Sequence, residues 1–355
     1  MSIKLTDRIK SFAELGDRIQ KVLKSSNTSD LSISETALFD AIKKASLHNP
    51  WYTEENCRHA MSGLAIILEK QKIEYWLNSY NINEKNSNPK TIAVVMAGNI
   101  PAVGFHDFLC VLISGNKILA KLSSQDDVLI KAISEVLEDI NNEWKTYIKF
   151  EDNIIRGFDA VIATGSNNTA RYFEYYFGKY PNIIRKNRNS IAVLSGKEND
   201  TEIEGLGEDI FRYFGLGCRN VSQILIPESY RIEDLLPSFE TWSFIGNHHK
   251  WANNYDYNKS IFLVNQVDHL DNGFAIFKPD QKLHSPVSVL NFHKYKTIED
   301  VKALINSEAN SIQCISSNIE IGIDNVSIVP LGKTQMPELW DYADRIDTMD
   351  LVLSC

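Results

Sequence analysis

The sequence predicts two doubly wound α/β domains that follow an N-terminal helical region. From about residue 90 onward, short continuous apolar runs alternate with longer amphipathic segments, which is typical of buried parallel strands joined by helices. Before that point the apolar residues recur at helical spacing instead. We expect a helical region at residues 1–88, a first α/β domain at 89–190, a second α/β domain at 191–325 and a C-terminal segment at 326–355.

The N-terminal region is expected to form capped helices. Ser34 would begin a helix at 35–45, and a second amphipathic helix would cover 54–69. Cys57 lies on the apolar stripe of the second helix, so we interpret it as a core residue. A polar, turn-rich stretch at 81–89 marks the boundary with the first α/β domain.

The first α/β domain should place its ligand-binding residues at one edge, because ligands of such domains bind at the carboxyl ends of the parallel strands. Those ends carry Gly98-Asn99, Lys121 and Gly165-Ser166. The expected strands are 91–96, 117–122 and 159–164, and the expected helices are 102–113, 126–143 and 168–177.

The second α/β domain is expected to begin with a strand at 191–194 and a helix at 202–214. The turn Gly215-Leu216-Gly217-Cys218 follows, and a strand at 223–226 comes after it. The remaining expected elements lie at 261–264, 287–292, 298–306 and 327–331.

Composition and charge exclude several classes of function. The 355 residues carry a net charge of −9 at pH 7 and 43% of them are hydrophobic, as in soluble globular proteins. Nucleic acids are bound through Lys and Arg, and no basic surplus is present, so we expect no nucleic-acid partner. The longest apolar runs are strand-sized and the N-terminus lacks an apolar signal segment. We therefore expect no membrane span and a cytoplasmic location.

The cysteines and histidines show no metal-binding pattern. The five cysteines are widely spaced, with no CxxC, and the adjacent pair His248-His249 has no partner at ligand spacing. We therefore expect free thiols and no metal.

Cys218 and Asn99 are candidate catalytic residues. The glycines before Cys218 permit close backbone approach and leave its N–H able to point at an acyl oxygen. The turn by itself is explained more simply by an inert thiol after a helix C-cap glycine. The Asn99 amide can donate to an oxyanion, although by itself it equally suits a helix cap ahead of Pro101.

Lys121 and Gly165-Ser166 are candidate contacts of a dinucleotide. A lysine can bind a ribose or a phosphate, and a helix N-terminus with a glycine and a hydroxyl can hold a diphosphate. A solvated lysine and a serine N-cap are the simpler interpretations of each residue alone. The Gly-x-Gly-x-x-Gly fingerprint is absent, so a dinucleotide would be held differently.

The order of these motifs resembles the aldehyde dehydrogenase superfamily over about residues 90–310. Residues 96–121 (MAGNIPAVGFHDFLCVLISGNKILAK) and 211–222 resemble the acyl-CoA reductase family, which includes the LuxC-type fatty-acid reductase of bacterial luminescence systems. The tail at 330–344 also resembles bacterial members of that family. The resemblance implies an aldehyde-dehydrogenase-like fold, with the dinucleotide at 89–190 and the catalytic domain at 191–325.

The resemblance also implies a role for each matching residue. Cys218 matches the nucleophile, and Asn99 matches the amide that binds the oxyanion. The cofactor-binding matches are Lys121 at the adenosine ribose, Ser123 and Ser124 in the motif after it, and Ser166 with Gly165 at the diphosphate.

One departure from the superfamily pattern favours reduction. Aldehyde-oxidising members carry a Glu that activates the water which hydrolyses the thioester, whereas residues 184–188 of this chain read Ile-Arg-Lys-Asn-Arg. General-base help is worth roughly 10²–10⁴-fold, so hydrolysis of an acyl group on Cys218 should be slow without it.

A second departure concerns the cofactor. Oxidising members often place a Glu where Ser124 stands, and a further ribose-contacting Glu is replaced by Lys282. The loss of negative charge removes repulsion against a 2′-phosphate. We therefore expect NADPH, with NADH as the alternative.

These expectations combine into an NADPH-dependent reductase that converts an acyl thioester (acyl-CoA, acyl-carrier protein or acyl-enzyme) to an aldehyde through Cys218. The alternatives are an aldehyde dehydrogenase or acyl-phosphate reductase of the same superfamily, and a non-catalytic acyl-binding subunit of a reductase complex. The expected partners are the acyl thioester, an acyl-transferring protein and further copies of this chain. The strand-rich run at 260–267 would pair between such copies.

Overall fold

The computed structural model describes residues 2–355, and the chain divides into two compact units. The first unit comprises Met1–Lys186 and Glu338–Cys355, and the second comprises Asn187–Pro337. The segment 326–355 is therefore shared, because its first part stays with the second unit and its last 18 residues return to the first.

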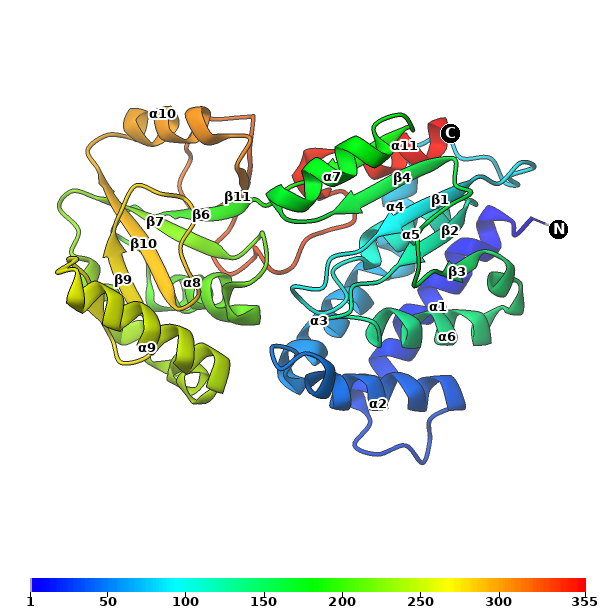
Figure 1. Cartoon of the computed structure of the whole chain (residues 1–355), viewed down its shortest axis with the longest axis horizontal. Helices are drawn as coiled ribbons and strands as arrows, with labels where there is room; N and C mark the ends of the chain where they lie inside the picture. The colour runs from blue at the N-terminus through cyan, green and yellow to red at the C-terminus, as the bar shows by residue number, and fades with distance from the viewer. Residues whose placement is uncertain (1) are drawn as a thin grey trace. The chain divides into compact units, whose positions relative to one another are not determined.

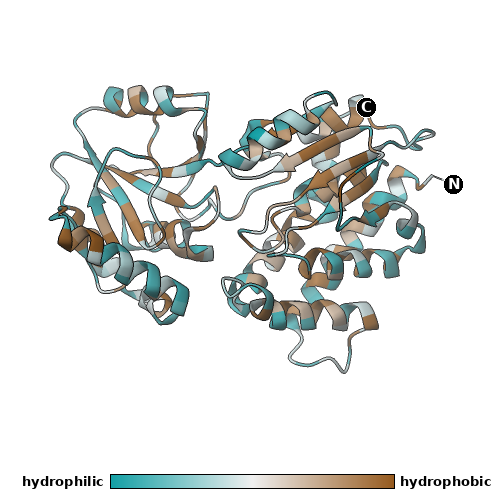
Figure 2. Ribbon diagram, in the orientation of Figure 1, coloured by the Kyte–Doolittle hydropathy of each residue, from teal (hydrophilic) through white to brown (hydrophobic). Residues whose placement is uncertain are grey.

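The first unit is built on a five-stranded sheet with the order β3-β2-β1-β4-β5, in which all neighbours are parallel (Figure 1). Side chains along a strand point to alternate faces, so Ile92 and Val94 enter one core while Ala93 enters the other. Both faces are buried, which explains the continuous apolar runs in Figure 2. The strands are β1 (Thr91–Val95), β2 (Lys117–Lys121), β3 (Ile148–Phe150), β4 (Ala160–Thr164) and β5 (Asn182–Arg185).

Helices cover both faces of this sheet. Phe173 and Phe177 of α7 (Asn167–Phe177) pack on one face, and the N-terminal helices share a large core with α5, α6 and the other face. The C-terminal helix α11 packs on α5 and β5. The other helices of this unit are α1 (Leu5–Lys24), α2 (Ile33–His48), α3 (Glu54–Ile67), α4 (Lys70–Leu77), α5 (Phe105–Ile113), α6 (Leu129–Ile140), η1 (Asn142–Thr146), η4 (Ala343–Arg345) and α11 (Thr348–Ser354).

The N-terminal helices match the expectation with one correction. Cys57 is completely buried in the core, as predicted. The N-cap of α2 is Ser32 rather than Ser34, because Ser32 forms a reciprocal capping box with Glu35. The Ser34 hydroxyl donates instead to Asp139 of α6, at 3.0 Å.

The second unit is built on a seven-stranded sheet with the order β12-β11-β6-β7-β10-β9-β8. Its neighbours are parallel except for β8 and β9, which are antiparallel. The two α/β units confirm the predicted fold class. The strands are β6 (Asn189–Val193), β7 (Val221–Pro227), β8 (Leu270–Asp271), β9 (Ile276–Pro279), β10 (Val289–Tyr295), β11 (Ile312–Ser316) and β12 (Ser327–Val329).

An aromatic cluster and a helix fill the two cores of the second unit. Phe211, at the end of α8, has ring contacts with Phe239, Trp242, Trp251 and Phe274. The other core is aliphatic and is closed by α10. The helices are α8 (Asp200–Phe211), η2 (Arg212–Gly215), η3 (Ile232–Asn247), α9 (His249–Val264) and α10 (Ile298–Glu308).

The prediction of a strand at 260–267 is wrong, because residues up to 264 form the last turns of α9. This helix buries Trp251, Tyr255 and Asn258, whose spacings of four and three residues lie on one helical face. Leu263 and Val264 are exposed at its end. The strand pairing between copies that was expected for this run therefore has no strand to support it.

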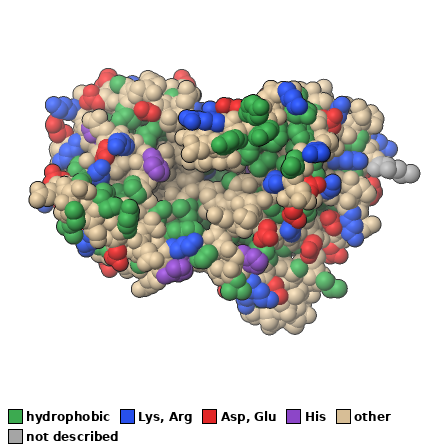
Figure 3. All heavy atoms as spheres, viewed as in Figure 1, with side chains coloured by type: hydrophobic (Ala, Val, Ile, Leu, Met, Phe, Trp, Pro, Cys, Tyr) green, Lys and Arg blue, Asp and Glu red, His purple; other side chains and the backbone are tan. Residues whose placement is uncertain are grey.

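The surface carries charges of both signs. Lys, Arg, Asp and Glu side chains are interspersed over the face seen in Figure 3. Within residues 2–355, no helix is both long enough and apolar enough to cross a bilayer.

Candidate active site

The first unit brings three predicted segments to one edge of its sheet. The chain crosses from β1 to β2 and β3 on one side, and then to β4 and β5 on the other, so β1 and β4 flank a topological switch point. Val95 is level with Lys121 on β2, and also with Ala163 on β4. The segments that follow β1, β2 and β4 therefore leave the sheet side by side, at the edge where such domains bind ligands.

Gly98 and Ser123 lie against each other at this edge. A Cβ added to Gly98 would lie 2.6 Å from the Ser123 Oγ, so only glycine allows this approach of the two loops. The Ser123 hydroxyl accepts a hydrogen bond from the Gln125 N–H at 3.2 Å, and Ser124 is exposed. Lys121 donates from Nζ to the Asn153 carbonyl at 2.6 Å, which fixes its side chain toward the loop after β3.

Ser166 is the N-cap of α7, which follows β4 directly. Its hydroxyl accepts from the Thr169 N–H at 3.2 Å, and the serine is exposed. A Cβ on Gly165 would lie 3.0 Å from the Phe173 ring and 3.1 Å from Thr169. The glycine therefore allows β4 to pass tightly into a helix whose first N–H groups face the edge, an arrangement that suits an anion.

Buried side chains hold the loop that carries Asn99. The Tyr52 hydroxyl donates to the Ile100 carbonyl at 2.8 Å, and an Asp126 carboxylate oxygen accepts from the Ala102 N–H at 2.7 Å. Asn49 adds a longer contact of 3.5 Å from Nδ2 to the Gly98 carbonyl. These contacts join residues that are 24 to 49 positions apart, and no local sequence signal predicted them.

The environment of Asp126 changes its titration. Burial raises the pKa of this carboxyl from 3.8 to about 6, while the hydrogen bond from the Ala102 N–H acts in the opposite direction. Burial likewise raises the pKa of the nearby Cys57 thiol to about 12, so that cysteine is inert at neutral pH.

Cys218 belongs to the second unit and lies on the turn between η2 and β7. It is partly exposed, whereas Cys57, Cys110 and Cys314 are buried. Three consecutive residues before it, Tyr213 to Gly215, have φ values between +55° and +67°, in the left-handed region. Such a run forces a sharp change of direction between the end of α8 and the turn.

Two buried side chains fix the backbone on either side of Cys218. The Asn220 side chain accepts from the Gly217 N–H at 2.8 Å and donates to the Arg212 carbonyl at 2.8 Å. The Ser190 hydroxyl donates to the Cys218 carbonyl at 3.0 Å. The peptide groups before and after the thiol are therefore both anchored to the body of the unit.

A buried carboxylate stabilises a loop that contacts the same turn. Asp209 of α8 is fully buried and accepts hydrogen bonds from the Ser316 hydroxyl, the Gly332 N–H and both donors of Thr334. Burial raises the pKa of Asp209, and these hydrogen bonds oppose the shift. The Thr334 carbonyl in turn accepts from Arg219 Nε at 2.5 Å. The loop after β12 is thus tied to the residue that follows Cys218.

The stretch that carries a hydrolytic Glu in aldehyde-oxidising enzymes is cationic here and is otherwise engaged. Arg185 at the end of β5 is buried and donates to both carboxylate oxygens of Asp107, at 2.5 and 2.9 Å, and to the Thr348 hydroxyl at 2.8 Å. Lys186 pairs with Glu174 at 2.9 Å. These side chains have structural partners within the first unit and supply no general base.

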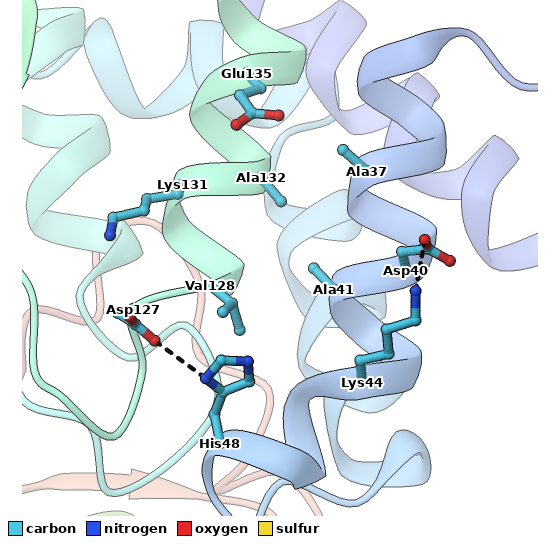
Figure 4. A pocket seen from close by; sticks show the side chains of 10 residues that line it. All are labelled: Ala37, Asp40, Ala41, Lys44, His48, Asp127, Val128, Lys131, Ala132 and Glu135. Carbon is cyan, nitrogen blue, oxygen red and sulfur yellow. Dashed lines mark hydrogen bonds and ion pairs between the residues drawn. The ribbon is translucent and has the colours of Figure 1, made fainter.

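A hollow of about 340 Å³ lies between α2 and α6 (Figure 4). Alanines from both helices line it, and two ion pairs border it: Lys44 with Asp40 at 2.9 Å and His48 with Asp127 at 3.8 Å. No cysteine, serine or threonine lines it. Among residues 2–355, no group of three or more His, Cys, Asp or Glu side chains could hold a metal ion.

A family model and a curated protein that are similar to this chain are both named as reductases of acyl thioesters. Residues 64–232 match the family model of the acyl-CoA reductases (LuxC). A long-chain acyl-protein thioester reductase of Aliivibrio fischeri is 21% identical over 267 residues, which cover 65% of this chain and 54% of that protein. This chain therefore spans about half the length of the curated relative it matches.

Solved structures share the fold. Aldehyde dehydrogenase 21 of Physcomitrella patens, in complex with succinate, superposes with a TM-score of 0.66 at 11% identity, covering 98% of this chain and 88% of that one. A mutant aldehyde dehydrogenase C of Pseudomonas syringae, complexed with NAD+ and octanal, gives 0.57 at 11% identity, covering 90% and 82%. These likenesses confirm the predicted aldehyde-dehydrogenase-like fold.

Proposed function

We propose that this chain, whose residues 64–232 match the family model of the acyl-CoA reductases (LuxC), reduces an acyl thioester to an aldehyde through an acyl group held on Cys218. The observation that carries the proposal is the Cys218 turn. A partly exposed thiol lies between two peptide groups that Asn220 and Ser190 fix in place. A thiol that only fills the core needs no such turn, whereas a nucleophile gains from a fixed direction of attack.

In the first step, the Cys218 thiolate attacks the carbonyl carbon of the incoming thioester. A carbon–sulfur bond forms, negative charge collects on the carbonyl oxygen, and the donor leaves as a thiolate when that charge returns. The Cys218 N–H is our candidate for one donor to this oxygen, and the Asn99 amide keeps the donor role that the resemblance implies.

The second step needs a hydride and must exclude water. A bound reduced nicotinamide dinucleotide supplies the hydride that brings the acyl group to the oxidation level of an aldehyde. The aldehyde leaves when its carbon–sulfur bond breaks, which returns the Cys218 thiolate. Because Arg185 and Lys186 stand where oxidising enzymes have a base, the acyl group resists hydrolysis long enough to be reduced.

The residues at the switch-point edge fit a dinucleotide. Gly98 and Gly165 let the segments at this edge pack closely, where a Cβ would meet Ser123 or Phe173, and an exposed serine caps α7. We assign the diphosphate to Gly165-Ser166 and the adenosine ribose to Lys121, Ser123 and Ser124. NADPH is the proposed cofactor, because Ser124 brings no negative charge toward a 2′-phosphate.

The donor is proposed to be a thioester of CoA or of a protein. The family model is that of acyl-CoA reductases, and the curated relative is named an acyl-protein thioester reductase. Both donors present the same acyl–sulfur bond to Cys218, so the chemistry above applies to either.

A substrate panel tests the proposal. The full chain would be incubated with acyl-CoAs of increasing length, or with the matching acyl phosphates, while NADPH or NADH oxidation is followed and aldehyde is trapped as a hydrazone. We expect thioester-dependent oxidation of NADPH that disappears in Cys218→Ala, with cofactor binding retained. Turnover with acyl phosphates alone, or turnover that survives in Cys218→Ala, would overturn the proposal.

A further inference from the structure

We infer that Tyr52 and Asp126 are positioning residues, which hold the loop 98–102 in one conformation and so fix the backbone that carries Asn99, the residue to which the resemblance gives the oxyanion-binding role. The inference rests on the proposed function, because it concerns the acylation of Cys218. The inference gives the N-terminal helical region a role in catalysis, in addition to its packing on one face of the sheet.

The first support is the burial of both side chains. Tyr52 is 1% exposed and Asp126 is 3% exposed, and each directs a polar atom to the backbone of the same short loop. A buried polar group costs free energy unless it is hydrogen-bonded, so these two groups are stable only while the loop keeps its present path. The loop and the two side chains therefore fix one another.

The second support is the conformation of the loop. Ala102 has φ +55°, in the left-handed region that side chains rarely adopt, and the Ala102 N–H is the group that Asp126 binds. Gly98, at the other end, is pressed against Ser123, and Gly104 packs against Met96. A strained loop between two close approaches needs outside support to stay in one conformation.

The third support is the rigidity of the segment that carries Tyr52. It lies in the connection between α2 and α3, outside residues 64–232 that match the family model. This connection is itself rigid, since the Tyr52 N–H donates to the Asn49 carbonyl at 2.8 Å, and the Asn49 side chain accepts from the Trp51 N–H at 3.1 Å. The helical region thus offers the loop a fixed hydroxyl rather than a flexible one.

The test separates acylation from simple thiol reactivity. Tyr52→Phe removes only the hydroxyl. Rapid mixing with an acyl-CoA, without cofactor, would measure CoA release in the first turnover, and iodoacetamide would measure alkylation of Cys218. Alkylation forms no oxyanion, so its rate does not depend on a donor to the carbonyl oxygen. We expect Tyr52→Phe to slow acylation about tenfold, as small misplacements of catalytic groups do, and to leave the alkylation rate unchanged.

Matched variants exclude a general loss of structure. Tyr147→Phe is the control, since Tyr147 is also buried in the first unit and its hydroxyl also binds backbone, accepting from the Ile3 N–H at 3.3 Å. We expect it to acylate like the wild type. Asp126→Asn keeps an oxygen that can accept from the Ala102 N–H and should acylate much faster than Asp126→Ala, which loses it.

The outcomes distinguish this inference from the function on which it rests. If the wild type itself releases no CoA, the proposed function fails. If the wild type acylates, and both Tyr52→Phe and Asp126→Ala acylate at the wild-type rate, the positioning inference is overturned and the proposed function stands. Parallel loss of acylation and alkylation in Tyr52→Phe would also overturn it, because the hydroxyl would then support the fold alone.

Discussion

The side chain of Asn220 spans the turn that carries Cys218, accepting from the Gly217 N–H and donating to the Arg212 carbonyl, each at 2.8 Å. It also donates to the Asp209 carbonyl at 3.1 Å, so one buried amide joins the end of α8 to the peptide group before Cys218. No aliphatic side chain can replace these contacts.

Asn220→Ala should therefore weaken both the fold and the chemistry. Leaving buried backbone groups unpaired costs about 1–3 kcal/mol each time, so we expect a clear drop in the free energy of unfolding measured in urea. We also expect slower CoA release in the first turnover. Asn325→Ala is the control, because Asn325 is exposed and binds only the Asn306 side chain. An Asn220→Ala protein with wild-type stability and acylation would contradict this account of the turn.

The buried pair of Arg185 and Asp107 should be important for stability rather than for catalysis. Asp107→Asn leaves the guanidinium without its counter-charge, and breaking a buried pair costs about 3–5 kcal/mol. We expect the thermal midpoint to fall by roughly 10 °C. Glu174→Gln, which breaks the exposed pair with Lys186, should change it little. Equal effects of the two substitutions would contradict the assignment.

Asp126 should make stability depend on pH in an unusual direction. Its pKa is about 6 in the folded protein, above the 3.8 of an ordinary aspartate, so the folded state binds the proton more tightly than the unfolded chain. The stability that this group contributes therefore falls as the pH rises from about 4 to about 6. Asp126→Asn lacks this dependence.

The difference in stability between Asp126→Asn and the wild type should thus shift in favour of the variant as the pH rises. A shift of about two pKa units corresponds to roughly 3 kcal/mol. Unfolding in urea at several pH values between 4.5 and 7.5 would measure the larger part of this change, about 2 kcal/mol. A constant difference across this range would show that the carboxyl titrates normally.

Ser124 should contribute to the choice of cofactor. Ser124→Glu restores the carboxylate of the oxidising enzymes and should raise the KM for NADPH at least about tenfold, because unit charges a few ångström apart repel by about 1–4 kcal/mol. The KM for NADH should stay nearly constant. Ser124→Gln, which has similar size and no charge, should behave like the wild type, and an equal effect of the two substitutions would assign the change to size.

The alternation of strands and helices was predictable because each parallel strand is buried on two faces. Ile92, Ala93 and Val94 form a continuous apolar run for that reason, and the ends of such runs locate the switch-point edge. The sequence alone therefore predicts that Asn99, Lys121 and Ser166 follow strands that end at the same edge of the sheet.

Other features depend on contacts that no local pattern contains. The run Ser260–Val264 is rich in strand-forming residues, yet it continues a helix whose register is set upstream by Trp251 and Tyr255. The hydrogen bond from Tyr52 to Ile100 joins residues 48 positions apart, and Tyr52 lies in a connection between helices. Such contacts follow from the packing of whole elements, so they become visible only in three dimensions.

The central claim is that Cys218 carries the acyl group. The most direct measurement is mass spectrometry of the Cys218 peptide after brief incubation of the chain with an acyl-CoA, before and after NADPH is added. We predict an added acyl mass on Cys218 that persists in buffer and disappears with NADPH as aldehyde forms. NADPH-dependent aldehyde formation with no acyl mass on Cys218 at any time would contradict it.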